Sequence, residues 1–136
     1  MSKKKAKWVR VKPLSKEEKA AIAAISDRFI DAVLKPCFLP DIRPTEFNYP
    51  VDIFCKWRGS KYSFITRYRS GFPENSGEEF DAPFTRLDHV EERFDETLFN
   101  VMWRRHTGQW WLLQSAVTLN EALRLIESEP MLQPIS

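Results

Sequence analysis

Apolar residues near the start of the chain recur at every third or fourth position, which is the period of an α-helix. The residues of this stripe are Ile22, Ile25, Phe29 and Val33. Ser15 and Glu18 precede it at the spacing of a capping box, in which each side chain bonds the backbone of the other, so a helix should begin at Ser15. Because Pro36 cannot continue a helix, we expect the helix to end near Leu34.

Four prolines lie between residues 36 and 50. Each removes a backbone donor and fixes a backbone angle, which disfavours both helix and sheet. We therefore expect residues 36–50 to form a stiff surface connection without regular structure.

Apolar and polar residues then alternate over residues 51–68, around a two-residue turn at 59–60 in which glycine comes first. The pairs predicted on the apolar face of this hairpin are Trp57–Tyr62, Cys55–Phe64, Ile53–Thr66 and Val51–Tyr68. The pairs predicted on its other face are Arg58–Lys61, Lys56–Ser63, Phe54–Ile65 and Asp52–Arg67. The opposite charges of Asp52 and Arg67 favour this register, whereas the like charges of Arg58 and Lys61 count against it.

Glycine, proline, asparagine and four acidic residues fill residues 70–81, which predicts a mobile loop. A third strand is expected over 83–90. A second hairpin is predicted over 99–115, with a three-residue loop at 106–108 and Gly108 in the left-handed conformation. Its predicted pairs are Trp103–Trp111, Val101–Leu113, Phe99–Ser115, Arg104–Trp110, Met102–Leu112 and Asn100–Gln114.

Thr118 and Glu121 form a second capping box, and Pro130 ends the helix that follows. The order of elements predicts an α+β fold: an N-terminal helix, an antiparallel meander of four to five strands and a C-terminal helix, with both helices packed on one sheet face. We expect a basic flexible arm over 1–13, a single α+β domain over 14–130 and a tail over 131–136.

The charges are unevenly distributed. Six of the 21 basic residues lie in the first twelve positions, without an acidic residue among them, so the rest of the chain has 15 basic and 19 acidic residues. Such an arm is usually solvated, although it can also grip phosphate or an acidic partner.

Cys37 and Cys55 lack the spacing of metal ligands, which favours two reduced, buried thiols as in a cytoplasmic protein. No apolar segment approaches the roughly 20 residues that cross a bilayer, and no apolar stretch follows the N-terminal lysines as in a secretory signal. We therefore expect a cytoplasmic protein that does not contact a membrane.

Three stretches carry a resemblance to known proteins: FDAPFTRLDHV, RRHTGQWW and TLNEALRLIE, within residues 80–130. Together they resemble a group of short bacterial proteins of uncharacterised activity. The resemblance implies a shared fold and a bacterial setting, and it implies no functional residue.

The sequence offers little for catalysis. Its two histidines are His89 and His106, and His106 falls in a predicted tight turn. Cys55 should face the core, where burial raises the pKa of a thiol. The acidic pairs at 78–79, 91–92 and 95–96 fall in expected loops, without the desolvation that acid–base catalysis needs. Neither a nucleophile elbow nor a phosphate-binding glycine loop occurs, so we expect neither catalytic residues nor a cofactor.

A metal site is conceivable where Asp88, His89, Glu91 and Glu92 stand close together in the sequence. Adjacent residues of a strand point to opposite faces, so Asp88 and His89 should not reach the same ion. We expect no metal there.

The second face of the predicted sheet combines cations with an aromatic residue and an apolar centre. The candidate binding residues are Arg58, Arg67, Arg69, Arg104 and Trp110. Arginine and tryptophan are typical anchors of protein interfaces. Alternatively, the proline-rich segment, the 70–81 loop or a second copy covers this face, and Arg104 lies over Trp110 in a local cation–π contact.

These observations favour a non-enzymatic interaction module that binds a protein partner, or forms a homodimer, through this face. The alternative is a nucleic-acid-associated protein that uses residues 3–12 and the same face. An enzyme acting on a small molecule is a third hypothesis, and it would need a pocket lined by His89 or by the acidic residues of 78–92.

Overall fold

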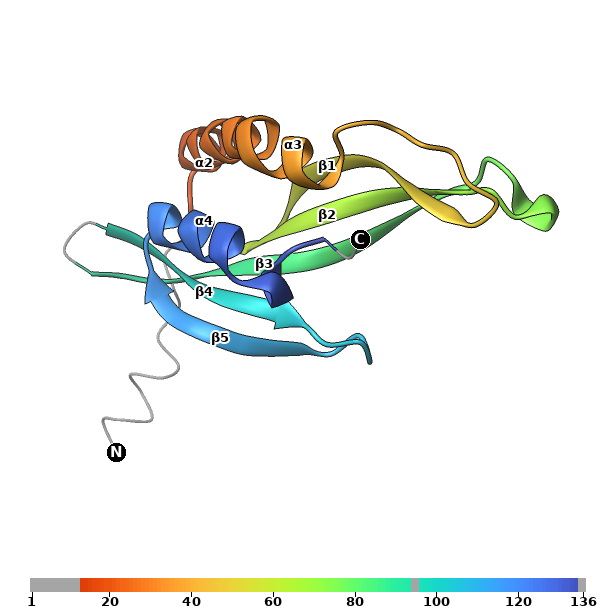
Figure 1. Cartoon of the computed structure of the whole chain (residues 1–136). Helices are drawn as coiled ribbons and strands as arrows, with labels where there is room; N and C mark the ends of the chain where they lie inside the picture. The colour runs from red at the N-terminus through yellow and green to blue at the C-terminus, as the bar shows by residue number, and fades with distance from the viewer. Residues whose placement is uncertain (1–12, 94–95, 135–136) are drawn as a thin grey trace.

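The structure is a computed structural model that describes residues 13–93 and 96–134. In this part of the chain, five antiparallel strands form one sheet in the order β1-β2-β3-β4-β5, and helices α2 and α4 cover one face of it (Figure 1). The strands are β1 (Asn48–Arg58), β2 (Lys61–Ser70), β3 (Glu79–Arg93), β4 (Glu96–Arg104) and β5 (Trp110–Val117). The helical elements are α2 (Lys16–Phe29), η1 (Ile30–Leu34), α3 (Lys35–Phe38), η2 (Pro73–Asn75), α4 (Leu119–Ser128) and η3 (Pro130–Leu132). The predicted α+β fold is confirmed.

Both capping boxes form as predicted. The Ser15 N–H donates to Glu18 Oε1 at 2.8 Å, and the Glu18 N–H donates to Ser15 Oγ at 3.1 Å. At α4, Thr118 and Glu121 make the same reciprocal pair at 2.9 and 3.2 Å. These bonds satisfy backbone donors that have no partner within the helix, which explains why each helix begins where it does.

The predicted end of the first helix near Leu34 is wrong. The helical path continues through η1, a π-helical turn in which the Lys35 N–H donates to the Ile30 carbonyl, and ends with α3 at Phe38. This turn restarts the hydrogen-bond ladder, so Pro36 falls in the first turn of a new helical segment, where a missing N–H costs little. Regular structure also resumes at Asn48, so the connection without helix or strand is shorter than residues 36–50.

The first hairpin keeps the predicted register near its turn, where Trp57 faces Tyr62, and down to Asp52 facing Arg67. The predicted pairing of Val51 with Tyr68 is wrong, because the register shifts between Pro50 and Asp52 and Pro50 faces Tyr68 instead. Proline cannot donate to the ladder, and strands accommodate it at irregularities of this kind.

The second hairpin keeps its predicted register only near the turn, unlike the first. Trp111 faces Trp103 and Gly108 has a φ of 86°, as predicted. Further on, two register shifts replace the predicted pairs: Val101 faces Gln114, and Phe99 faces Val117. Ala116, with a φ of 52°, lies within the shifted region and donates its N–H to Asn100 Oδ1 at 3.0 Å. The side-chain oxygen of Asn100 thus accepts a backbone N–H that has lost its regular place in the strand pairing.

Strand β3 is longer than predicted. It begins at Glu79, inside the expected 70–81 loop, and extends beyond residue 90. Its first residues pair with the end of β2, with Glu79 opposite Arg69 and Asp81 opposite Arg67. Opposite charges facing each other across two strands favour their pairing, so the acidic residues that suggested a loop instead extend the sheet.

The core lies between the helices and the sheet, where Leu34, Phe64, Leu87 and Ile126 are completely buried. Leu132 is equally buried, and its carbonyl accepts a 2.7 Å hydrogen bond from Thr85 Oγ1. Residues 131–134, expected to be part of a tail, therefore pack back on the sheet after α4 (Figure 1). Residues 1–12, most of the expected arm, and 135–136 lie outside the described residues.

Both cysteines are free, but the expectation that both are buried is wrong, because Cys37 on α3 is exposed. Cys55 is half-buried on the helix-facing side of β1, and burial raises the pKa of its thiol. None of the helices in the described ranges combines the length and the apolar character needed to cross a membrane.

Candidate binding face

A hollow of about 430 Å³ lies on the sheet face turned away from α2 and α4. Lys56, Arg58 and Lys61 line it at the end where β1 turns into β2. Ile65 and Pro83 add apolar surface from the middle strands. The other residues that line it are Ser63, Asp81, Arg86 and Trp110. Strands β1, β2, β3 and β5 all contribute, because alternate residues of each strand point to this side.

Trp110 lies in the hollow beneath an arginine, but not the one that the sequence suggested. The guanidinium carbon of Arg86 is 4.8 Å from the centroid of the Trp110 ring. Asp88 holds Arg86 through two bonds, 2.7 Å to Nε and 2.9 Å to Nη2. Arg104 is the cross-strand neighbour of Trp110, as predicted, yet its Nη1 reaches toward the Pro83 carbonyl at 3.5 Å. The cation–π contact expected from Arg104 is therefore made by Arg86.

Arg86 is a site residue that the sequence analysis missed. Its place depends on the register of β3, which is paired with β2 on one side and β4 on the other. Sequence could not fix that register, because no tight turn joins β3 to β2. The available indication was its position two residues before Asp88, which puts both side chains on the same strand face.

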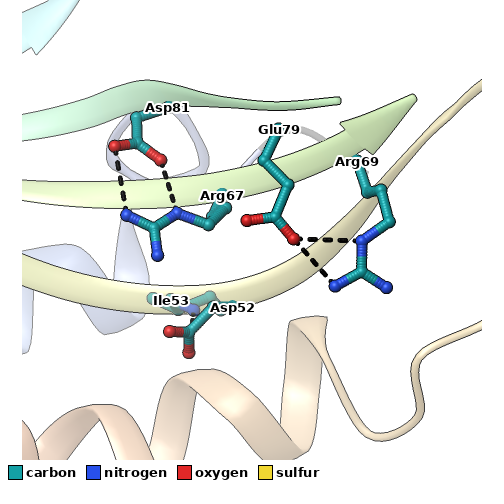
Figure 2. Close-up of polar contacts among 6 residues, drawn as sticks. All are labelled: Asp52, Ile53, Arg67, Arg69, Glu79 and Asp81. Atoms are coloured by element: carbon teal, nitrogen blue, oxygen red, sulfur yellow. Dashed lines mark hydrogen bonds and ion pairs between the residues drawn. The ribbon is translucent and has the colours of Figure 1, made fainter. Parts of the chain in front are cut away.

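Arg67 and Arg69 are held by carboxylates of the neighbouring strand. Arg67 Nε lies 2.9 Å from Asp81 Oδ1, and Arg69 Nη2 lies 2.8 Å from Glu79 Oε2 (Figure 2). The hydrogen bond that Arg67 donates to Asp81 is the main cause of a raised pKa at Arg67. These two predicted site residues therefore lie on the same sheet, but internal carboxylates already balance their charges.

Asp52 faces Arg67 in the predicted register, but it does not take the arginine as its ion-pair partner. Instead, Asp52 Oδ1 lies 3.5 Å from Lys35 Nζ. The same carboxylate accepts the Ile53 N–H at 2.9 Å (Figure 2). The Arg67 guanidinium lies 4.7 Å from the Phe54 ring and turns to Asp81 on its other side. A residue in a central strand has two neighbours, and the pattern of one hairpin cannot decide between them.

Lys56, Arg58 and Lys61 differ from the three arginines of this face that carboxylates bind, Arg67, Arg69 and Arg86. Within the described ranges, none of them has a carboxylate oxygen within 4.0 Å. Arg58 and Lys61 are also direct cross-strand neighbours, so two like charges face each other at the turn. Of the five predicted site residues, Arg58 and Trp110 line the hollow, Arg104 lies at its margin, and Arg67 and Arg69 lie in ion pairs.

Asp88 and His89, two of the residues considered for a metal site, point to opposite faces of the sheet. His89 is buried on the helix-facing side, with its ring centroid 6.0 Å from that of Phe99. Asp88 points to the other face, where it binds Arg86. The described part of the chain contains no group of three or more His, Cys, Asp or Glu residues placed to hold a metal ion. The side chains of residues 91–93 lie outside that part.

Most of the chain matches a known protein family. One family profile, described as a domain of unknown function, DUF3024, matches residues 14–133. The chain belongs to the DUF3024 family. A domain of unknown function fits the expected resemblance to proteins of uncharacterised activity. Searches against curated proteins and against solved structures gave no significant match.

The DUF3024 match includes every strand, both long helices and all the residues that line the hollow. It also extends beyond Pro130 to residue 133, in agreement with the burial of Leu132. The open sheet face is therefore part of the DUF3024 domain itself.

Proposed function

We propose that this DUF3024 domain is a non-enzymatic interaction module that binds a protein partner through its open sheet face. The observation that carries the proposal is the hollow, where Arg58, Arg86 and Trp110 surround an apolar centre. Arginine and tryptophan are the residues that most often dominate binding energy in protein interfaces, and a charged margin around apolar surface is typical of such sites.

The size of the hollow favours a segment of a partner over a second rigid domain. Its volume of about 430 Å³ is within the range of sites that enclose a small ligand or a few side chains. Ile65 and Pro83 offer apolar contact at its centre, and Ser63 adds a hydroxyl that can donate or accept. An extended segment laid over the hollow would reach all of these groups.

Photo-crosslinking tests the proposal. A photoreactive benzoylphenylalanine replaces Arg104, which is exposed at the margin of the hollow, and in a control chain it replaces Ala24, which is exposed on α2. We expect one protein adduct from position 104 that is absent from position 24 and is lost when Trp110→Ala is added. Urea unfolding would confirm that the chain carrying Trp110→Ala is folded.

Equal adducts from both positions, or an adduct that survives Trp110→Ala, would contradict the proposal. An adduct between two copies of this chain, together with a dimer in light scattering, would indicate the homodimer instead.

Nucleic-acid association is the second candidate, supported by an aromatic ring and cations in one hollow. The excess of acidic residues after position 12 counts against a long polyanion. Retention on heparin or single-stranded DNA at low salt, and an elevated 260/280 nm absorbance ratio after purification, would favour it. The absence of catalysis, the bacterial setting and the cytoplasmic location remain predictions.

A further inference from the structure

We infer that the hollow receives an acidic, extended segment whose carboxylates bind Lys56, Arg58 and Lys61. The inference rests on the proposed function and names the chemistry of the partner. It begins from the charges of the open face: carboxylates bind Arg67, Arg69 and Arg86 there, whereas three cations gather without a carboxylate at the β1–β2 end of the hollow.

Three arginines of this face, Arg67, Arg69 and Arg86, are each bound by a carboxylate at 2.9 Å or less. By contrast, the cations at the β1–β2 turn have no such partner among the residues that the structure describes. The nearest acidic neighbour in the ladder is Asp88, which faces Lys61 across β2 and β3 but gives both its oxygens to Arg86.

The cross-strand pairing of Arg58 with Lys61 places two positive charges opposite each other. Like charges directly opposite each other destabilise a hairpin. Sequences usually depart from local rules of this kind at functional sites. An anion bound between these side chains would convert the repulsion into attraction.

The spacing of the cations matches a peptide in the extended conformation. Lys56 and Arg58 are two residues apart on one face of β1, so their Cα atoms are about 7 Å apart along the strand. Acidic residues at alternate positions of an extended segment have the same spacing. Lys61, on the neighbouring strand, can bind the same carboxylates from the side.

Two observations favour a short acidic peptide over a nucleic acid. Arg86 already covers one face of the Trp110 ring, which leaves less aromatic surface for stacking bases. The chain beyond its first twelve residues is acidic overall, so it repels a polyanion that extends past the hollow. Ile65 and Pro83 next to the cations would accept one apolar side chain of the segment.

Fluorescence anisotropy at low salt tests the inference with the full chain and a labelled peptide, Glu-Thr-Glu-Thr-Glu-Leu. The wild-type protein should bind it, and binding should weaken as salt is raised. Arg58→Glu should weaken binding at least about tenfold, which corresponds to ~1.4 kcal/mol. Arg124→Glu, the same charge change at an exposed site on α4, should alter it less than about twofold.

Arg58→Glu is a suitable variant because it should not harm folding. A glutamate at position 58 faces Lys61, so an attractive pair replaces a repulsive one and the melting temperature should stay equal or rise. A loss of binding in this variant therefore reports on the site and not on unfolding.

The inference is overturned if the wild-type chain does not bind the peptide, or if Lys-Thr-Lys-Thr-Lys-Leu binds as well. Equal losses in Arg58→Glu and Arg124→Glu would overturn it too, because they would indicate attraction by net charge alone. Tighter binding of a single-stranded oligothymidine would favour nucleic acid. If position 104 crosslinks to a partner while the acidic peptide does not bind, the protein-binding function is supported and only the inference of an acidic partner segment is rejected.

Discussion

Replacing Leu132 with alanine should destabilise this domain by about 3 kcal/mol, although the residue lies beyond the last α-helix. The Leu132 side chain has no exposed surface and belongs to the core cluster. Truncating a buried leucine costs about 2–5 kcal/mol, through lost burial and the cavity that remains. We place the value inside this range because the segment 130–132 is a single helical turn that can partly relax into the space.

The hydrogen bond at this residue does not add to the expected loss. Thr85 Oγ1 donates to the backbone carbonyl of residue 132, which the alanine variant keeps. Met131→Ala is a matched control, because Met131 is the neighbouring residue and is 45% exposed. It should change the free energy of unfolding by less than about 0.5 kcal/mol.

Urea unfolding followed by tryptophan fluorescence measures both variants. With a slope of ~1.5–3 kcal/mol per molar urea, Leu132→Ala should lower the midpoint by about 1–2 M. If both variants lowered the midpoint by the same small amount, residue 132 would not be part of the core and the boundary expected near residue 130 would be restored.

Three further predictions concern polar groups at other places in the fold. Thr66 is buried, and its hydroxyl has no hydrogen-bond partner in the described ranges, so Thr66→Val should raise the free energy of unfolding by about 1 kcal/mol, seen as a higher melting temperature. Exposed Cys37 should react with iodoacetamide well before Cys55, whose burial raises its pKa, as mass spectrometry of timed samples would show; equal rates would contradict the structure. Hydrogen bonds from Thr118 lower the pKa of Glu121 in the folded protein. The ionised Glu121 side chain therefore stabilises the fold at pH values above the ordinary pKa of a glutamic acid, and this stabilisation disappears as the pH falls through the folded pKa. Glu121→Gln should therefore lose less stability between pH 7 and pH 3, measured by urea midpoints, and an unchanged pH dependence would refute this.

Sequence reasoning succeeded where the structure depends on neighbouring residues. Each capping box is decided by two side chains three positions apart, and the glycine at 59 determines the first turn, which then sets the register of the strands beside it. The face that carries Arg58 and Trp110 could be found in the same way, by alternation.

It failed where distant parts of the chain decide. The second hairpin shifts its register twice, on either side of Val101, and the Val101 and Phe99 side chains are buried in a core that includes residues of both helices. Bulges of this kind are not visible in a pattern of period two. The partners of Arg67 and Arg86 depend on β3, which the sequence could not align with its neighbours. The residues after Pro130 have no periodicity, so their docking could not be foreseen.

The order of the elements also bears on how the chain folds as it is synthesised. Each strand pairs with the next in sequence, so the meander can form progressively from short loops. Helix α4 and the turn after it follow all five strands, and they cover part of the apolar side that includes Leu87 and Val101. Until these last elements leave the ribosome, the sheet presents an uncovered hydrophobic surface. A nascent chain that stalls after β5 would thus be a substrate for chaperones or proteases.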